Sequence, residues 1–534
     1  MATAHFATIL LTDVGLTWPD GSIALTGITA AFGRGRTGLI GANGSGKSTL
    51  LRLITGELQP TTGMVALSNE VGYLPQALTL GVTATAADLL GVRPKVDALR
   101  AIEAGDVAEA HFEVLGDDWD ISTRAGEALR SAGLTEADLD RPVGEMSGGE
   151  AILLTIAGLR LGAAPITVLD EPTNNLDRVA RQRLAGMVRS WPGALVVVSH
   201  DTTLLELMDD TAELHAGALR LFGGPYSAYL DQLDREQAAA QQARRSAEHV
   251  LKKEKQQRIE AETTLARRSR YARTDFENKR APGIVMGLRK SAAQVSAGKL
   301  RREVDGKVQD ARAAAADASA RVRSADTIRV DLPDPQVPTG KRLAELHGSN
   351  RSFLLHGPAR VALTGPNGVG KTSLLESLVH PATARAHAAS ATAHTDRIGY
   401  LSQRLDGLNE AGSALDNLRA AAPHTSPGEL RNRLARFLIR GDAVGRPVGS
   451  LSGGERFRVS LARLLLADPP AHLIVLDEPT NNLDRQSVDQ LVGALGSYRG
   501  ALLVASHDEV FLTRLGITDW LSLDAAGGLS VETR

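Results

Sequence analysis

The sequence predicts an α/β protein in which one domain architecture occurs twice along the chain, with a long α-helical hairpin between the copies. Three observations predict it. The same short motifs recur in the same order in both halves of the 534 residues. Apolar runs typical of buried parallel strands end in acidic residues in each half, and the stretch between the halves is rich in helix-forming residues. We expect a first domain over residues 1–232, the hairpin over 233–325 and a second domain over 326–534.

The composition excludes several classes of protein. Hydrophobic residues make up 43% and charged residues 23% of the chain, as in ordinary globular proteins. The absence of cysteine excludes disulfides and thiolate metal sites, and it fits a reducing compartment. The N-terminal residues lack the features of a signal peptide, and no run of about 18 apolar residues occurs. We therefore expect no membrane-spanning segment and a cytoplasmic location.

The repeated motifs indicate a tandem duplication. The pairs are GANGSGKST at 41–49 and GPNGVGKTS at 365–373, VGYLPQ at 71–76 and IGYLSQ at 398–403, MSGGE at 146–150 and LSGGE at 451–455, and VLDEPTNNLDR at 168–178 and again at 475–485. In both copies a histidine that follows an apolar run lies 29 positions after the glutamate of the last motif. Such a register does not arise by chance.

The first motif of each copy predicts a nucleotide-binding loop. Glycines allow backbone N–H groups to converge on phosphate oxygens at the start of a helix, and the lysine reaches the β- and γ-phosphates. The hydroxyl that follows the lysine is suited to Mg²⁺. The predicted binding residues are Gly41, Asn43, Gly44, Gly46, Lys47, Ser48 and Thr49 in the first copy and Gly365, Asn367, Gly368, Gly370, Lys371, Thr372 and Ser373 in the second.

Acids at the ends of the apolar runs 166–169 and 473–476 predict the hydrolytic chemistry. An aspartate there, Asp170 or Asp477, can hold Mg²⁺ together with Ser48 or Thr372. The next residue, Glu171 or Glu478, is placed to orient or deprotonate a water. A neutral imidazole from His200 or His507 can sense the γ-phosphate. The last predicted site residues, which can bridge metal and water, are Gln76 and Gln403.

These motifs resemble those of ATP-binding cassette proteins, and more narrowly those of the ABC-F group, which has two cassettes and no transmembrane domain. The resemblance covers nearly the whole chain. It implies two P-loop cassettes in which the SGG signature of one completes the ATP site of the other, within a monomer. One site would join the first loop to Ser452, Gly453 and Gly454, and the other would join the second loop to Ser147, Gly148 and Gly149. ATP and Mg²⁺ are the implied cofactors.

Some positions depart from the family pattern or differ between the copies. Both copies read TNNLD where ABC-F proteins often read TNHLD. Trp18, 23 residues before Gly41, resembles the aromatic residue that stacks on adenine, whereas the second cassette shows no clear equivalent. Ala151 follows the first signature and Arg456 the second, which indicates that the two sites are not equivalent. Because both copies keep the glutamate and the histidine, we expect both to hydrolyse ATP.

The hairpin is strongly basic. Residues 237–323 contain 21 lysines and arginines and 10 acidic residues, although the whole chain has a net charge of -2. We expect helices near 233–279 and 289–324, with a tip at 281–288. Positive charge gathers toward the tip and suits phosphate backbones, although such a run can also be a solvated helix face. The predicted nucleic-acid contacts are Arg267, Arg268, Arg270, Arg273, Lys279, Arg280, Arg289 and Lys290.

The tip carries apolar residues in what we expect to be a glycine-bracketed turn. Such a patch can insert into a partner or fold back on the hairpin. The residues are Ile284, Val285, Met286 and Leu288.

In ABC-F proteins the linker between the cassettes enters the ribosomal tRNA exit site and reaches P-site tRNA. The resemblance therefore implies the ribosome as partner, through large-subunit rRNA and P-site tRNA. The long arm with its apolar tip favours the antibiotic-resistance type that protects ribosomes over a housekeeping translation factor. An ATPase subunit of a drug-export transporter and a DNA-associated ATPase remain alternatives, since basic charge does not distinguish RNA from DNA.

The first copy has 22 more residues than the second between its glutamine and its signature, around 111–132. This segment is either a longer helical subdomain, which we favour, or a ribosome-contacting insertion.

Overall fold

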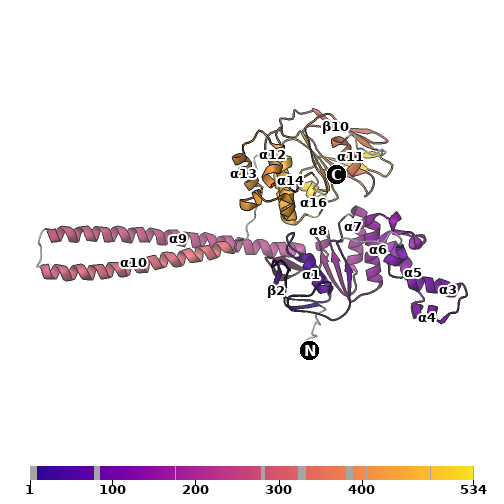
Figure 1. The fold of residues 1–534 in the computed structure, drawn as a ribbon, viewed down its shortest axis with the longest axis horizontal. Coiled ribbons are helices and arrows are strands. Elements are labelled where there is room, and N and C mark those ends of the chain that lie inside the picture. The colour runs from indigo at the N-terminus through magenta and orange to yellow at the C-terminus, as the bar shows by residue number, and fades with distance from the viewer. Residues whose placement is uncertain are drawn as a thin grey trace. The chain divides into compact units, whose positions relative to one another are not determined.

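Figure 1 shows the computed structural model of the chain. It describes residues 9–76, 84–174, 176–277, 283–322, 332–380, 389–403, 407–481 and 483–532, with the backbone alone at 272, 275–277 and 283–290. Contacts divide the chain into two compact units, Met1–Tyr226 with Thr327–Arg534, and Ser227–Asp326. The first unit holds both cassettes and the second is the hairpin. The division into three domains at 232/233 and 325/326 stays a prediction.

The first cassette is built on two sheets. The strands of its six-stranded sheet run parallel except for the last, in the order β5 (Val71–Leu74), β6 (Ile166–Asp170), β7 (Ala194–Val198), β3 (Gly35–Ile40), β8 (Asp210–His215) and β9 (Ala218–Gly223). An antiparallel sheet has the order β2 (Ile23–Phe32), β1 (Ile9–Thr17) and β4 (Thr62–Leu67).

Helices pack on these sheets. They are α1 (Lys47–Ile54), α2 (Ala86–Leu89), α3 (Arg93–Glu103), α4 (Glu109–Leu115), α5 (Ile121–Ala132), α6 (Gly148–Leu161), α7 (Arg178–Arg189) and α8 (Thr202–Leu205), with 3₁₀ turns at Glu136–Asp140 and Val143–Glu145.

The second cassette repeats this topology. Its sheets have the orders β14 (Ile398–Leu401), β15 (Leu473–Asp477), β16 (Ala501–Ala505), β12 (Arg360–Thr364), β17 (Asp519–Leu523) and β18 (Leu529–Glu532), and β11 (Ser352–His356), β10 (Arg342–His347) and β13 (Ser390–Ala393). Its helices are α11 (Lys371–Val379), α12 (Ala414–Ala421), α13 (Pro427–Arg436), α14 (Gly453–Leu465), α15 (Arg485–Gly496) and α16 (Glu509–Arg514), with 3₁₀ turns at Gly441–Val444 and Val448–Ser450.

The parallel strands position the predicted site. Every residue of β6, β7, β15 and β16 is buried, which explains their continuous apolar runs. The carboxyl ends of neighbouring parallel strands meet at one edge of a sheet, where ligands bind in open α/β folds. In the first cassette this edge carries the glutamine after β5, the aspartate that ends β6, the histidine after β7 and the phosphate loop after β3.

The 22 additional residues of the first cassette belong to a larger helical subdomain. Between the glutamine and the signature, the first cassette has the four helices α2 to α5, where the second cassette has α12 and α13. The helix α3 packs against α4, and α5 packs against α6. The favoured interpretation as a longer helical subdomain agrees with this arrangement.

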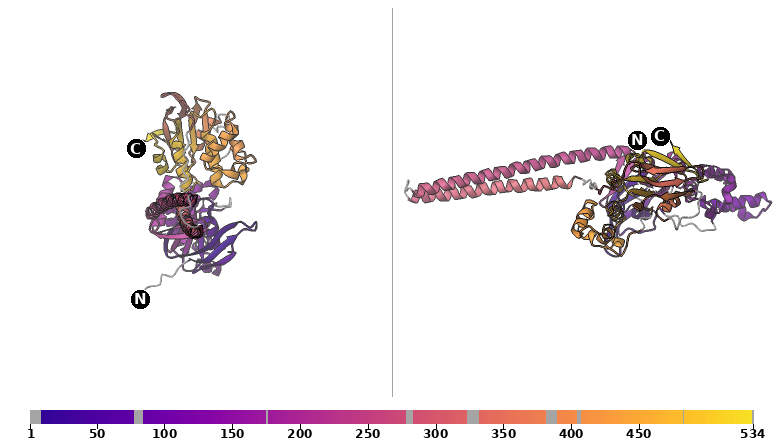
Figure 2. Two further views of the ribbon diagram at one scale, coloured as in Figure 1. Left: turned by 90° about the vertical axis from the view of Figure 1, so that its left-hand side faces the viewer. Right: turned by 90° about the horizontal axis from the view of Figure 1, so that it is seen from above.

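The hairpin consists of α9 (Tyr226–Glu277), with 52 residues, and α10 (Gly283–Ala320), with 38. The two helices run side by side in Figure 1 and in the right-hand view of Figure 2. Arg258 Nε on α9 lies 3.1 Å from Asp305 Oδ1 on α10, and the apolar side chains of Leu265, Leu300 and Val304 line a small crevice beside this pair.

Both helices begin earlier than the sequence predicts, at Tyr226 and Gly283. The prediction of a turn over 283–288 is wrong, because the backbone there is the first part of α10. Two glycines spaced four apart cost about 1 kcal/mol each in a helix, which does not terminate it, and a proline directly before a helix favours its start. Of the predicted contact and tip residues, Lys279 and Arg280 lie outside the described residues. The side chains of Ile284, Val285, Met286, Leu288, Arg289 and Lys290 also lie outside them.

None of the helices in the described ranges combines the length and the apolar character needed to cross a membrane.

Truncating a core aromatic of the second cassette should destabilise the fold. Phe457 on α14 is 1% exposed, and replacing it by alanine should lower the free energy of unfolding by about 3 to 5 kcal/mol. The midpoint of urea denaturation measures this effect. Phe112 on α4 is 39% exposed, so the matched Phe112→Ala change should cost less than about 1 kcal/mol. Equal shifts for the two variants would contradict this account of the core.

Candidate functional site

Each phosphate loop folds around its own lysine. Lys47, the first residue of α1, donates from Nζ to the carbonyl oxygens of Gly41 at 2.8 Å and Ala42 at 3.1 Å. In the second loop, Lys371 donates to Gly365 O at 2.8 Å and to the next carbonyl at 3.0 Å. Both lysines are buried, so a cation lies at the N-terminus of each helix, where partial positive charge already favours an anion.

The first glycine of each loop is required by close contact. A Cβ atom on Gly41 would lie 2.4 Å from the Leu214 carbonyl oxygen, and one on Gly365 would lie 2.2 Å from that of Leu523. Both glycines also have a positive φ. No other residue fits this backbone, which keeps the loop close to the neighbouring strand.

The aspartates that end β6 and β15 are buried carboxyls with unsatisfied oxygens. Asp170 is 2% and Asp477 1% exposed. Among the described residues, Asp170 Oδ1 and both carboxyl oxygens of Asp477 have no hydrogen-bond partner. Burial raises the pKa of both groups, and the hydroxyls of Ser48 and Thr372 beside them act in the opposite direction. A buried carboxylate without partners is costly unless a cation or a ligand compensates it.

The following glutamates have strained backbones in both copies. Glu171 has a φ of 51° and Glu478 one of 44°, in the left-handed region that residues with side chains rarely adopt. Their amide groups donate to the carbonyls of Val198 and Ala505, at 2.9 and 2.8 Å. Such strain clusters at functional sites. Burial raises the pKa of both carboxyls, that of Glu478 to about 7, whereas Lys47 or Lys371 opposes the rise.

The two histidines face these glutamates as neutral imidazoles. His200 Nε2 lies 3.3 Å from Glu171 Oε1, and His507 Nε2 lies 3.5 Å from Glu478 Oε1. Burial and the adjacent lysine lower the pKa of His200 to about 4 and that of His507 to about 3. The imidazoles are therefore uncharged at neutral pH, and these contacts are not ion pairs. His507 Nε2 also lies 3.1 Å from Asn367 Oδ1.

Each signature motif begins a helix whose N-terminus is capped by the serine of the motif. The side chains of Ser147 and Ser452 cap α6 and α14 by accepting from the N–H groups of Glu150 and Glu455. The two glutamates in turn accept from the serine amides, at 2.8 and 2.9 Å. These capping boxes fix the helix start.

Two cavities collect most of the predicted ATP-site residues. The second site has a cavity of about 510 Å³, lined by Ser147, Gly148, Gly149, Leu176, Arg181, Asn367, Gly368, Gly370, Lys371, Thr372, Ser373, Gln403, Asp477, Glu478, Asn481 and His507. The first site has one of about 410 Å³, lined by Asn43, Gly44, Gly46, Lys47, Ser48, Thr49, Gln76, Asp170, Glu171, Val198, His200 and Gly453.

Both cavities combine a phosphate loop of one cassette with signature residues of the other. In the second site all three signature residues, 147–149, line the cavity, whereas Gly453 alone represents its signature in the first. Predicted residues that do not line these two cavities are Trp18, Gly41, Gly365, Ser452 and Gly454. Trp18 is 37% exposed at the turn after β1.

Sequence reasoning missed two aspartates that join the cassettes. Asp484 Oδ2 accepts from the backbone N–H of Asn43 in the first loop at 2.8 Å. Asp177 Oδ2 accepts from the backbone N–H of Asn367 in the second loop at 3.4 Å. Both aspartates also cap their own helices, α15 and α7. The sequence pattern could have indicated them, because both aspartates belong to the motif VLDEPTNNLDR, which occurs identically in the two copies and contains Glu171 and Glu478.

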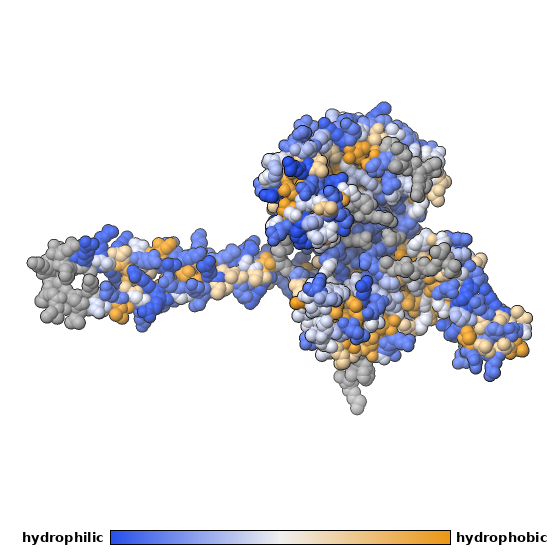
Figure 3. All heavy atoms as spheres, viewed as in Figure 1, coloured by the Kyte–Doolittle hydropathy of each residue, from blue (hydrophilic) through white to orange (hydrophobic). Residues whose placement is uncertain are grey.

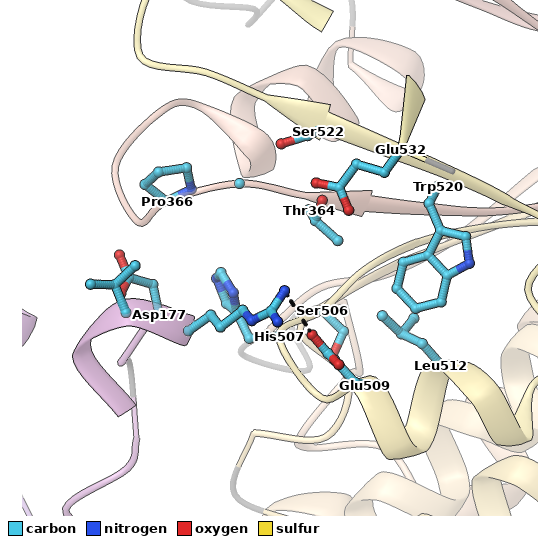
Figure 4. Close-up of a pocket in the computed structure, with 13 residues that line it drawn as sticks. Asp177, Thr364, Pro366, Ser506, His507, Glu509, Leu512, Trp520, Ser522 and Glu532 are labelled. Atoms are coloured by element: carbon cyan, nitrogen blue, oxygen red, sulfur yellow. Dashed lines mark ion pairs between the residues drawn. The ribbon is translucent and has the colours of Figure 1, made fainter. Parts of the chain in front are cut away.

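The residues after these aspartates make different contacts. Arg178 Nη1 lies 3.2 Å from Glu509 Oε1, and this ion pair is the dashed line in Figure 4. Arg485 Nη1 instead donates to the Tyr226 hydroxyl at 3.1 Å, with its guanidinium 5.8 Å from the ring centroid. The cavity in Figure 4, about 170 Å³, lies beside the second site and shares His507 with it.

The predicted nucleic-acid contacts that the structure describes lie exposed on α9. They are Arg267, Arg268, Arg270 and Arg273. In the described part of the hairpin, other basic residues form ion pairs, namely Arg244, Arg258, Lys307 and Arg321. Hydrophilic residues dominate the surface of the two long helices in Figure 3. Three of the exposed arginines, 267, 268 and 270, therefore carry charge that no described acidic side chain neutralises.

Comparison with known proteins places this arrangement in a family. The ABC transporter family model matches residues 25–174 and 349–481. The chain is 30% identical to the tylosin resistance ATP-binding protein TlrC of Streptomyces fradiae, over 93% of this chain and 94% of that protein. It is 28% identical to the energy-dependent translational throttle protein EttA of Mycobacterium tuberculosis, over 96% of this chain and 88% of that protein.

Among solved structures, the archaeal ribosome recycling factor aABCE1, in complex with a ribosomal stalk protein, has the same fold. Its TM-score is 0.55 at 18% identity, and the match covers 97% of this chain and 89% of that one. With two matched cassettes, two phosphate loops completed by signature residues and relatives that align over nearly their whole length, the chain belongs to the ABC-F group of the ATP-binding cassette family and is an ATPase.

Proposed function

We propose that this ATPase is a translation factor that binds the ribosome through its hairpin, near the tRNA exit site and P-site tRNA, and protects it from an antibiotic. The single observation that carries the ribosomal part is the hairpin itself. It is a pair of long helices between two cassettes, and its exposed arginines 267, 268 and 270 lack acidic partners among the described residues. An ATPase core alone has no use for such an arm, whereas a polyphosphate partner explains its charge.

The similar proteins support both parts of the proposal. EttA is named as a translational throttle, and its match extends over 96% of this chain. TlrC is named for tylosin resistance and aligns over 94% of its own length. We favour the resistance type because the match to TlrC extends over nearly the whole of both proteins.

At each proposed ATP site, the residues divide the work of hydrolysis. The phosphate loop and its lysine hold the β- and γ-phosphates, and the signature helix of the opposite cassette faces the γ-phosphate. A water oxygen bonds to the γ-phosphorus as the bond to the bridging oxygen breaks, and ADP leaves with that electron pair. Glu171 or Glu478 accepts the proton of the water, and the neutral imidazole beside it orients that water.

The residues present fit Mg²⁺. The unpartnered oxygens of Asp170 and Asp477 lie next to the hydroxyls of Ser48 and Thr372. Oxygen ligands of this kind, completed by water and phosphate, are those that Mg²⁺ prefers. No cluster of three or more metal-binding side chains occurs in the described parts of the chain, and a phosphate-bound Mg²⁺ needs none. When bound, the ion would offset the charge that builds up on the phosphates.

Removing both proposed bases tests the cycle. In the Glu171→Gln, Glu478→Gln double variant, ATP should still bind while kcat falls by about 100-fold or more, because the proton acceptor is absent. The protein should then remain on ribosomes with ATP and sediment with them in a sucrose gradient. Lys47→Ala, Lys371→Ala is the control, which should neither bind ATP nor accumulate. A double Gln variant that stays in the free fractions would argue against a ribosomal partner.

Charge neutralisation tests the hairpin. Replacing Arg267, Arg268 and Arg270 by glutamine should weaken ribosome binding, and the slope of log affinity against log salt should fall by about 2 to 3, at about 0.7 to 0.9 for each phosphate that is no longer neutralised. ATPase activity of the free protein should be retained. The matched control replaces Arg244, Arg258 and Lys307, whose charges are paired within the hairpin. If both triple variants bind alike, the unpaired arginines do not form the ribosome-binding surface.

Expression in a drug-sensitive bacterium tests the resistance type. The chain should raise the inhibitory concentration of tylosin, and the Glu171→Gln, Glu478→Gln double variant should not. Replacing Ile284, Val285 and Met286 by serine should abolish protection while ribosome sedimentation is retained, because an apolar tip is then no longer available to a partner. Full protection by this triple variant would exclude a role for these side chains.

A further inference from the structure

The two ATP sites differ at one position near the start of the helices that join the cassettes. Arg181 on α7 lies four residues after the capping Asp177, and Val488 on α15 lies four residues after the capping Asp484. Residues four apart share one face of a helix. Each capping aspartate contacts the phosphate loop of the opposite cassette, so the residue four positions later lies on the same side of its helix as that contact.

At this position the second site receives an arginine from the first cassette. Arg181 lines the cavity of the second site together with Lys371, Glu478 and His507. Val488 does not line the cavity of the first site and instead packs against the core of its own cassette.

The guanidinium of Arg181 is held in place and keeps donors free. Nε donates to the Leu176 carbonyl at 3.1 Å, and Nη1 donates to Asp201 Oδ2 at 3.3 Å. The side chain is 24% exposed. Arginine has five N–H donors, so three of them have no partner among the residues the structure describes. The charge of Arg181 acts on a group of the second site. Burial and the charge of Lys371 are the larger causes of the lowered pKa of His507, and the charge of Arg181 lowers it further.

We propose that Arg181 is supplied in trans to the second ATP site, where its free N–H donors face the γ-phosphate of ATP, and that the first site lacks such a residue. As the bridging bond breaks, negative charge spreads over the terminal phosphoryl oxygens and the leaving ADP, and a fixed guanidinium stabilises that charge. The two sites therefore turn over at unequal rates, and the second depends on a side chain from the first cassette.

This inference rests on the proposed roles of Glu171 and Glu478, but not on ribosome binding. Turnover by the free full-length protein tests it, so a failure of ribosome association would leave the test readable. In the Glu171→Gln background only the second site hydrolyses ATP, and in the Glu478→Gln background only the first does.

Arg181→Met should lower kcat of the second site about tenfold or more. KM for ATP should change by less than about threefold, because the interaction strengthens as charge develops. Arg181→Lys should restore part of kcat. In the first-site background Arg181→Met should change kcat by less than about twofold. Arg178→Met, on the same helix but exposed and paired with Glu509, is the matched control in both backgrounds.

An equal decrease of kcat in both backgrounds would overturn the inference, because it would mean that Arg181 only supports the junction between the cassettes. An unchanged kcat of the second site in the Arg181→Met variant would also overturn the inference. Each single Gln variant could be inactive because hydrolysis at one site requires hydrolysis at the other. In that case the turnover of Arg181→Met is compared with that of Arg178→Met in the otherwise unchanged chain. Equal turnover of those two variants overturns the proposal.

Discussion

Each phosphate loop depends on a carboxylate from the opposite cassette. Asp484 accepts from the Asn43 amide and, with its other oxygen, from the Ser487 amide at the start of α15. Asp177 does the same between Asn367 and the start of α7. Because one side chain both caps a helix and contacts a loop of the other half, a shift of either helix displaces the loop that it touches. Neither ATP site is complete within one cassette.

The two copies share the residues that folding requires and differ in the residues at the junction between the cassettes. Buried strands, capped helices and glycines at close contacts recur in both copies, since a change there creates a cavity, an orphan donor or a clash. Side chains that contact the opposite cassette do not have to be the same in both copies for each cassette to fold. Arg178 meets Glu509, whereas its counterpart Arg485 meets Tyr226. Arg181 lines an ATP cavity, whereas its counterpart Val488 packs in a core. Two sites of similar backbone therefore carry different electrostatics.

Patterns in the sequence predict those features of the molecule that depend on burial or on contacts within one short segment. The run 166–169 is apolar because β6 is buried on both sides, and the loop glycines are fixed by backbone contact, so both are recognisable in advance. The neutrality of the histidines also follows from burial beside a lysine. Other features escape local patterns. Asp484 lies 441 residues from the loop amide that it contacts, so its role emerges only once the cassettes are side by side. At the start of α10 two glycines indicate a turn, although the helix tolerates them.

The first phosphate loop is joined to the first residue of α9 through a short series of contacts. The backbone N–H of Asn43 donates to Asp484, and the next residue, Arg485, donates to the Tyr226 hydroxyl, where α9 begins. The first phosphate loop is thus linked through neighbouring residues to the start of the helix that carries the unpaired arginines. Arg178, which follows the aspartate that contacts the second loop, instead pairs with Glu509 of the second cassette.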